Sequence, residues 1–113
     1  MDGRADPELS GPERDEICID EVLRAVADPV RLSMVRQLAA HPRADEGVAC
    51  GEIPLGISKS TRTHHLRVLR EAGVIALRAE GTRRLATLRS DDLDARFPGL
   101  LDAILDRSIP AEA

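Results

Sequence analysis

ISKSTRTHHLRVLREAGVI, residues 57–75, is the stretch that decides the fold of this chain. Ser58 is a preferred helix N-cap, because its hydroxyl accepts a hydrogen bond from an otherwise unpaired N–H of the first turn. Leu66 and Leu69 are three residues apart, a spacing that places them on one side of a helix. Gly73 predicts the end of that helix, since glycine adopts the left-handed conformation at little cost. The stretch therefore predicts a helix that begins directly after Ser58 and has one apolar side.

The opposite side of this predicted helix is polar and basic. Its hydroxyl, imidazole, ammonium and guanidinium groups can donate hydrogen bonds to phosphate oxygens and to base edges. A solvated helix face has a similar composition, so the helix alone leaves both interpretations open. The residues expected to contact DNA from this helix are Lys59, Ser60, Thr61, Arg62, Thr63, His64 and Arg67.

Two short strand-like runs follow the helix, at residues 74–78 and 84–89. The segment between them, residues 79–83, contains a glycine and has the length of a hairpin turn. A basic hairpin directly after a polar helix is a more specific sign of DNA binding than either element alone. The hairpin residues expected to contact DNA are Arg78, Thr82, Arg83 and Arg84.

Charge is distributed unevenly along the chain. The 113 residues carry a net charge of −4, which by itself argues against a nucleic acid partner. Residues 59–84, however, hold 7 of the 16 basic residues and 2 of the 20 acidic ones, so this segment carries +5 and the remainder −9. Because association with DNA depends on the potential of the contacting face, the local excess supports DNA binding.

The chain resembles the ArsR/SmtB family of bacterial winged helix-turn-helix repressors. The similarity is carried by LRAVADPVRL at residues 23–32, by residues 58–75 and by the basic hairpin, and it extends over roughly residues 16–106. It implies a mainly helical fold with a small β-hairpin, in the order α-α-α-α-β-β-α. It also implies a homodimer that binds an inverted-repeat operator in double-stranded DNA and is released by an inducer.

The remaining sequence predicts one domain over residues 15–107, with a disordered tail at 1–14 and a short tail at 108–113. Asp28 is expected to cap a second helix, with Pro29 at its first position, where a missing N–H costs nothing. Ser90 is expected to cap the last helix, in which Pro98 predicts a kink or a late start.

The first and last predicted helices carry more apolar surface than a domain of this size needs for its own core. By analogy with the family, we expect them to pair across a two-fold axis; closing a monomeric core is the alternative. The expected dimer-interface residues are Ile17, Ile19, Val22, Leu23, Leu100, Leu101, Ile104 and Leu105.

Two features depart from the family pattern. Only seven residues, 51–57, separate Cys50 from Ser58, so a helix before the recognition helix is limited to about one turn. Arg62 occupies a position where relatives often have a buried aliphatic residue. Its side chain is expected either to reach the DNA backbone or to pair with an acidic neighbour.

Cys18 and Cys50 are the two cysteines of the chain and the candidate sensing residues. Thiolates bind arsenite, Cd²⁺ and Zn²⁺, but these ions need three or four ligands, so a second subunit would have to contribute. A disulfide acting as a redox switch and simple burial as small apolar residues are the alternatives. We expect no other cofactor and no metal site; residues 91–107 contain no His or Cys, which disfavours the family's zinc-type site. The inducer is not predicted.

Several classes of function are disfavoured. The sequence has no Gly-rich phosphate loop, nucleophile elbow or His-Glu-x-x-His pattern, so we expect no enzyme. It has no Trp or Tyr, with Phe97 as its one aromatic residue, which argues against base stacking on RNA or single strands. The lack of a signal peptide and of a long apolar run predicts a cytoplasmic protein without membrane association. A winged-helix protein-interaction module is the alternative, and it predicts a neutral or acidic face where residues 59–84 are basic.

Overall fold

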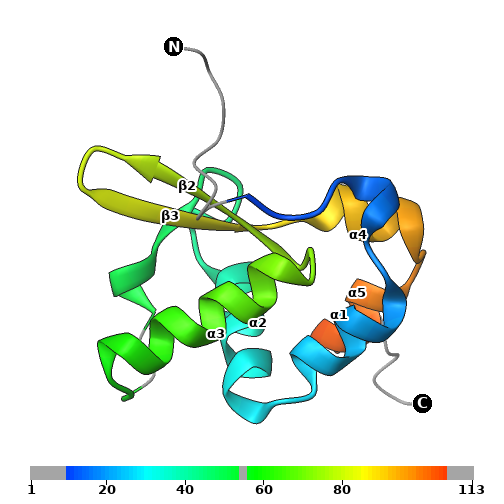
Figure 1. The fold of residues 1–113 in the computed structure, drawn as a ribbon, viewed down its shortest axis with the longest axis horizontal. Coiled ribbons are helices and arrows are strands. Elements are labelled where there is room, and N and C mark those ends of the chain that lie inside the picture. Colours follow the sequence, from blue (N-terminus) through cyan, green and yellow to red (C-terminus); the bar gives the residue numbers. More distant parts are fainter. Residues whose placement is uncertain (1–9, 54–55, 107–113) are drawn as a thin grey trace.

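The computed structural model describes residues 10–53 and 56–106. In chain order, its elements are η1 (Arg14–Glu16), α1 (Ile19–Val26), α2 (Pro29–Ala40), β1 (Val48–Ala49), η2 (Cys50–Glu52), α3 (Lys59–Glu71), β2 (Ile75–Glu80), β3 (Arg83–Leu88), α4 (Ser90–Arg96) and α5 (Leu100–Leu105). Figure 1 shows α3 lying across the front of the molecule, the β2–β3 hairpin projecting to the upper left, and α1, α4 and α5 grouped on the right. The fold is mainly helical with a small antiparallel sheet, as predicted.

The helix predicted after Ser58 is confirmed as α3. The Ser58 hydroxyl accepts a hydrogen bond from the Thr61 backbone N–H at 3.1 Å. At the other end, Gly73 has φ of +87°, and the N–H groups of Gly73 and Val74 donate to the carbonyls of Arg70 and Leu69. This pair of bonds is a Schellman motif, which satisfies carbonyls that the helix end would leave unpaired. Local capping at both ends therefore defines α3.

The cap of α2 is confirmed as well. The Asp28 carboxylate accepts a hydrogen bond from the Arg31 backbone N–H at 3.0 Å, and Pro29 is the first helical residue. The hydrogen bond from the Arg31 backbone lowers the pKa of the Asp28 carboxyl below its ordinary value. Beyond the cap, α2 presents Met34, Val35 and Leu38 to the core.

The hairpin is longer than its predicted strands. Glu80 pairs with Arg83, so the turn consists of Gly81 and Thr82 alone. Gly81 has φ of +64°, the conformation that glycine provides at the first position of a type II′ hairpin turn. The predicted turn at residues 79–83 was too long, because Ala79, Glu80 and Arg83 still belong to the ladder. A third strand, β1, pairs with β3 in the order β1-β3-β2 and was not predicted.

The helix order differs from the predicted α-α-α-α-β-β-α at two places. The expected helix before α3 is a single 3₁₀ turn, η2, in agreement with the limit of about one turn. The expected last helix is divided into α4 and α5 by residues 97–99, where Pro98 is followed by Gly99 with φ of +87°. Arg89, rather than Ser90, is the N-cap of α4 and makes no side-chain cap bond, so that prediction was wrong.

The domain begins earlier than predicted, with a segment of residues 10–17 that we call the N-terminal strap. Arg89 donates to the Pro12 carbonyl at 2.6 Å, and Arg96 donates to the Ile17 carbonyl at 2.7 Å. Residues 10–14, assigned to the predicted tail, thus pack against the domain, while residues 1–9 and 107–113 lie outside the described residues. None of the described helices is long and apolar enough to cross a membrane.

Candidate nucleic-acid interface

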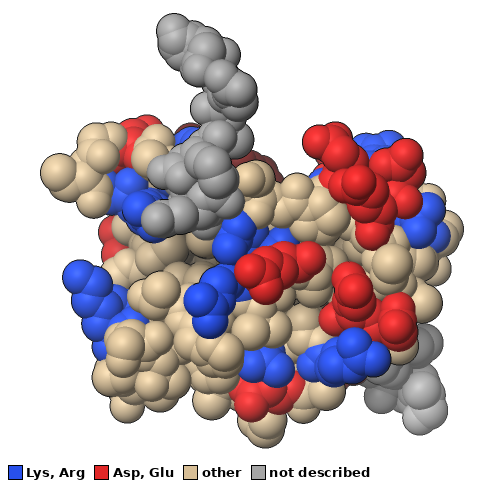
Figure 2. Space-filling view, viewed as in Figure 1, with Lys and Arg blue, Asp and Glu red and all other residues tan. Residues whose placement is uncertain are grey.

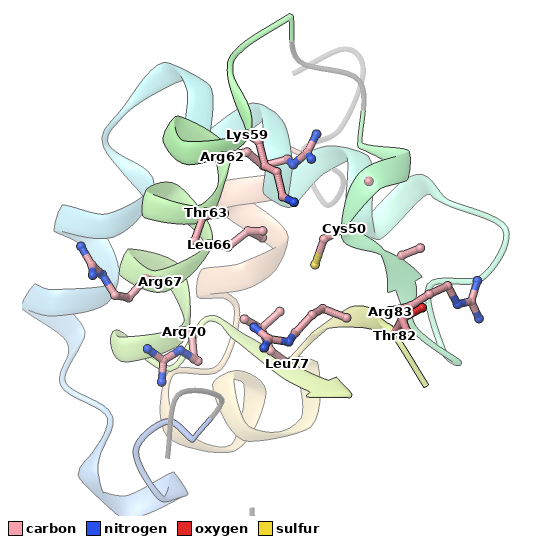
Figure 3. Close-up of a pocket in the computed structure, with 13 residues that line it drawn as sticks. Cys50, Lys59, Arg62, Thr63, Leu66, Arg67, Arg70, Leu77, Thr82 and Arg83 are labelled. Carbon is pink, nitrogen blue, oxygen red and sulfur yellow. The ribbon is translucent and has the colours of Figure 1, made fainter. Parts of the chain in front are cut away.

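Between α3 and the β2–β3 hairpin lies a groove of about 860 Å³, which we call the cationic groove (Figure 3). One wall is α3, the other is the hairpin, and the turn β1–η2 closes one end. Its lining residues are Ala49, Cys50, Gly51, Lys59, Arg62, Thr63, Leu66, Arg67, Arg70, Leu77, Thr82, Arg83 and Arg84. Six of these residues are cationic and none is acidic, so the groove is positively charged and suited to an anionic ligand.

The polar side of α3 is divided into two faces. Lys59 and Thr63 line the cationic groove, whereas Ser60 and His64 are exposed and do not line it. Arg67 belongs to the lining, although its guanidinium is turned away from the hairpin in Figure 3. The residues predicted to contact DNA from α3 therefore serve two different surfaces, one facing the hairpin and one facing outward.

The hairpin also has two faces, and its arginines are divided between them. Residues paired across an antiparallel ladder share a face, so Arg84 lies with its partner Ala79 on the face of Leu77, which lines the cationic groove. Arg78, one position out of phase, lies on the other face and donates to the Glu46 carbonyl at 2.7 Å. The structure thus places Arg78 on the side of the hairpin opposite the recognition helix.

Arg83 shares the face of Arg78, near the tip of the hairpin. Its guanidinium forms an ion pair of 2.7 Å with Glu80, and both side chains are about half exposed. Figure 3 shows the Arg83 side chain directed away from the middle of the groove. Arg84, in contrast, has no ion pair or hydrogen bond within the described part of the chain, so its charge is available to a ligand.

The charges of the folded surface follow the pattern seen along the chain. In Figure 2, basic side chains gather over α3 and the base of the hairpin, and large acidic groups lie to the right, over α1 and α4. An opposing acidic end would weaken contact with DNA everywhere except at the basic face. The fold therefore presents one surface suited to DNA.

Comparison with known proteins agrees with this geometry. Residues 26–78 match a family model described as a helix-turn-helix domain. The uncharacterized HTH-type transcriptional regulator YceK of Bacillus subtilis is 30% identical over 86 residues, which cover 74% of this chain and 83% of that protein. The chain belongs to the family of helix-turn-helix transcriptional regulators. This confirms the family resemblance seen in the sequence.

Two further proteins are similar to this regulator. The HTH-type transcriptional regulator Rv0324 of Mycobacterium tuberculosis is 29% identical over 100 residues, and the match covers 86% of this chain but 42% of that longer protein. The solution structure of the homodimeric winged helix-turn-helix DNA-binding domain Mb0332 of Mycobacterium bovis, a possible ArsR-family regulator, matches with a TM-score of 0.60 and 25% identity. That match covers 82% of each chain.

Within the regulator, Arg62 is half-buried at the end of the cationic groove beside Cys50 and has no acidic partner among the described residues. Figure 3 shows the Lys59 and Arg62 side chains both directed into the groove from the first turn of α3. Of the two predicted roles for Arg62, pairing with an acidic neighbour is therefore not seen.

His65 takes a structural position. Its Nδ1 lies 3.1 Å from a guanidinium nitrogen of Arg31, which also donates to the Ala25 carbonyl at 2.6 Å. His65 thus links α3 to α2 and to the end of α1. The adjacent His64 is exposed, with Nδ1 3.4 Å from a guanidinium nitrogen of Arg67, and remains part of the outward face.

Arg70 was missed by the sequence analysis. It is buried, 7% exposed, and its guanidinium donates to the Ser10 carbonyl of the N-terminal strap and lies 3.6 Å from the Glu71 carboxylate. Its Nε has no partner among the described residues. Arg70 follows Leu69 directly and lies on the same side of α3 as the apolar residues. Its burial could have been predicted only if a basic residue had been included in that apolar stripe.

The two cysteines lie far apart in the regulator. Cys18 is exposed at the start of α1, on the right of Figure 1, and Cys50 is half-buried in η2, on the left. A disulfide within one chain would therefore require a large rearrangement. Burial raises the pKa of the Cys50 thiol, while the nearby charges of Arg62 and Arg84 act in the opposite direction. The described residues contain no group of three His, Cys, Asp or Glu side chains placed to hold a metal ion.

The predicted dimer residues fall into two groups. Ile17, Val22 and Leu101 are at most 1% exposed and belong to the core of a single chain, so their placement at an interface was wrong. Ile19 and Leu23 are each 46% exposed and lie one turn apart on α1. The other three, Leu100, Ile104 and Leu105, are partly buried against the core.

Proposed function

We propose that this regulator binds an inverted-repeat operator as a homodimer and represses transcription until an inducer releases it. The observation that carries the proposal is the division of α3, which buries Leu66 and Leu69 while presenting an exposed polar face beside a basic hairpin. A helix anchored in this way is suited to enter the major groove with the hairpin against the neighbouring backbone.

The roles of individual residues follow from their positions. Ser60 and His64 lie on the outward face and are assigned to base edges, together with Thr63 at the border of the groove. Lys59, Arg67 and Arg84 are assigned to phosphate oxygens, because long cationic side chains position a protein on the backbone. Arg78 is not assigned to DNA, since it binds the Glu46 carbonyl on the far face of the hairpin.

The dimer is supported by an apolar patch at the end remote from the hairpin. Ile19 and Leu23 are the two large hydrophobic side chains exposed in the described structure, and they share one face of α1. A symmetric dimer joined through this patch would present two copies of α3, as palindromic operators require. The replacement Leu23→Asp should therefore give a monomer in sedimentation experiments and weaken operator binding, while Arg24→Gln on the same helix should preserve the dimer.

The experiment that tests the proposal is fluorescence anisotropy with a duplex from the region upstream of the protein's own gene. A random duplex of equal length serves as the reference, and each is measured at low and moderate salt. Operator binding that exceeds random binding and weakens with salt is the expected result. The variant His64→Ala should reduce the preference for the operator over random DNA, while Arg36→Gln on α2, outside the groove, should leave that preference unchanged. A failure to bind any duplex at low salt would contradict the proposal and favour a protein-interaction module.

A further inference from the structure

The floor of the cationic groove is apolar, although its rim is charged. Leu66 of α3 and Leu77 of β2 line the groove from its two walls. Figure 3 shows the Leu66 side chain and the Cys50 sulfur directed toward the same space. An apolar floor of this kind gains stability when an apolar group covers it.

Three cations surround this floor without acidic partners in the described residues. Lys59 and Arg62 point into the groove from the first turn of α3. Arg84 lines the same groove from β3, where its pairing with Ala79 places it on the face of Leu77. Cations gathered beside an apolar surface bind an anion more strongly than cations in open water.

The volume of about 860 Å³ lies within the range of small-molecule sites, roughly 300–1,000 Å³. A DNA duplex carries its phosphates at its surface, so it can contact the rim but has no apolar segment to place on the floor. Leu66 is 6% exposed, so only a small part of its side chain borders the groove. The floor and the rim together suit a ligand with an apolar body and an anionic head.

We propose that the cationic groove binds a small amphipathic anion, such as a medium-chain carboxylate, and that this ligand displaces DNA by direct competition. The anionic head binds Arg62, Arg84 and Lys59, and the apolar chain lies over Leu66 and Leu77. Because the same cations face the DNA, ligand and operator exclude one another. The competition rests on the proposed function, whereas ligand binding itself does not.

Cys50 provides a readout of ligand binding that requires no DNA. Decanoate, below its micellar concentration, is added to the full chain, and the rates of alkylation of Cys50 and Cys18 by iodoacetamide are followed by peptide mass spectrometry. We expect saturating decanoate to slow alkylation of Cys50 at least about tenfold, because the chain covers the thiol, and to leave the exposed Cys18 unchanged. Decan-1-ol and acetate, which lack the charge and the chain respectively, should protect Cys50 far less.

The cationic rim is tested by the double variant Arg62→Gln with Arg84→Gln. Half-protection of Cys50 should require about a hundredfold more decanoate, since each lost charge-assisted contact weakens binding by about tenfold. The matched control, Arg24→Gln with Arg43→Gln, removes the same charge from residues outside the groove and should behave as wild type. Calorimetric titration with decanoate gives a second measurement that does not depend on the reactivity of Cys50.

Competition is measured by repeating the operator anisotropy with increasing decanoate. The apparent Kd for the operator should rise in proportion to decanoate above half-saturation. Equal protection of Cys50 by decan-1-ol, or protection unchanged in the double variant, would overturn the site. Protection without any change in the operator Kd would overturn the competition. Protection in a protein that binds no duplex would support the site and contradict only the proposed function.

Discussion

The arginines at the two ends of this molecule have opposite environments. At the N-terminal strap, Arg89 binds both the Pro12 carbonyl and the Asp92 carboxylate, and Arg96 binds the Ile17 carbonyl. At the cationic groove, Arg62 and Arg84 have no hydrogen-bonding or ion-pair partner among the described residues. One residue type thus holds the chain together at one end and remains available to a ligand at the other.

This difference shows why net charge is a poor guide to binding. An arginine that is held by a backbone carbonyl or a carboxylate is directed into the protein and away from a ligand, whatever it adds to the total charge. Arg70 combines both situations, because it lines the cationic groove and also donates to the Ser10 carbonyl of the strap. Substitutions at the strap should therefore change stability, and substitutions at the groove should change binding.

The largest effect is expected where α3 meets the strap, at Gly73. A Cβ at this position would lie 2.7 Å from Cγ1 of the fully buried Ile17, and φ is +87°. Gly73→Ala should lower the free energy of unfolding by about 3 kcal/mol, from steric overlap and backbone strain together. Gly81→Ala is the matched control, since Gly81 also has positive φ but nothing within 4 Å of a Cβ, and it should cost about 1 kcal/mol. Urea unfolding at one protein concentration measures both, and equal losses would show that the strap contact contributes nothing.

The next effect separates the two kinds of arginine. Arg89→Met removes the bonds to Pro12 and Asp92 from a side chain that is 15% exposed, and should lower the free energy of unfolding by about 2 kcal/mol. The salt dependence of DNA binding should not change, because this guanidinium does not face the groove. A smaller salt slope in Arg89→Met would assign Arg89 to DNA and break the distinction between the two ends.

At the groove, Arg84→Gln and Arg83→Gln form a second matched pair. Arg84→Gln should weaken operator and random DNA alike by about tenfold and reduce the salt slope by about one unit, since one phosphate contact is lost. Arg83→Gln should have a smaller effect, because Arg83 is paired with Glu80 on the other face of the hairpin. Neither change should move the midpoint of urea unfolding appreciably. A larger loss of DNA affinity for Arg83→Gln would contradict the assignment of the two faces.

The smallest effect concerns pH and the strap. Hydrogen bonds from Arg14 and from Arg89 lower the pKa of the Asp92 carboxyl below its ordinary value of 3.8. A lowered folded-state pKa adds stability above the unfolded-state value, and this stability is lost as the pH falls through the folded-state value. Asp92→Asn should therefore cost about 1 kcal/mol at neutral pH, and the difference from wild type should shrink as the pH falls below 3.8 and vanish below the folded-state pKa. A difference that persists in acid would assign the effect to packing rather than charge.

Structure could be predicted from local sequence wherever the interaction that determines it joins residues only a few positions apart. Ser58 and Asp28 cap their helices, and Gly73 ends α3, because each interacts with backbone groups within one turn. The polar side of α3 could be predicted for the same reason. Predictions failed where distant segments meet: Ser90 looked like a cap, but the residue before it, Arg89, takes the N-cap position and binds the strap.

By itself, then, the sequence determined the recognition helix, the hairpin and the family, because capping, periodicity and turn chemistry act over short distances. Only the tertiary structure decided that Ile17 and Val22 belong to the core of one chain, that β1 joins the sheet, and which arginines face the groove. Those outcomes depend on which segments become neighbours when the chain packs, and a residue's type and local spacing do not specify its distant partners.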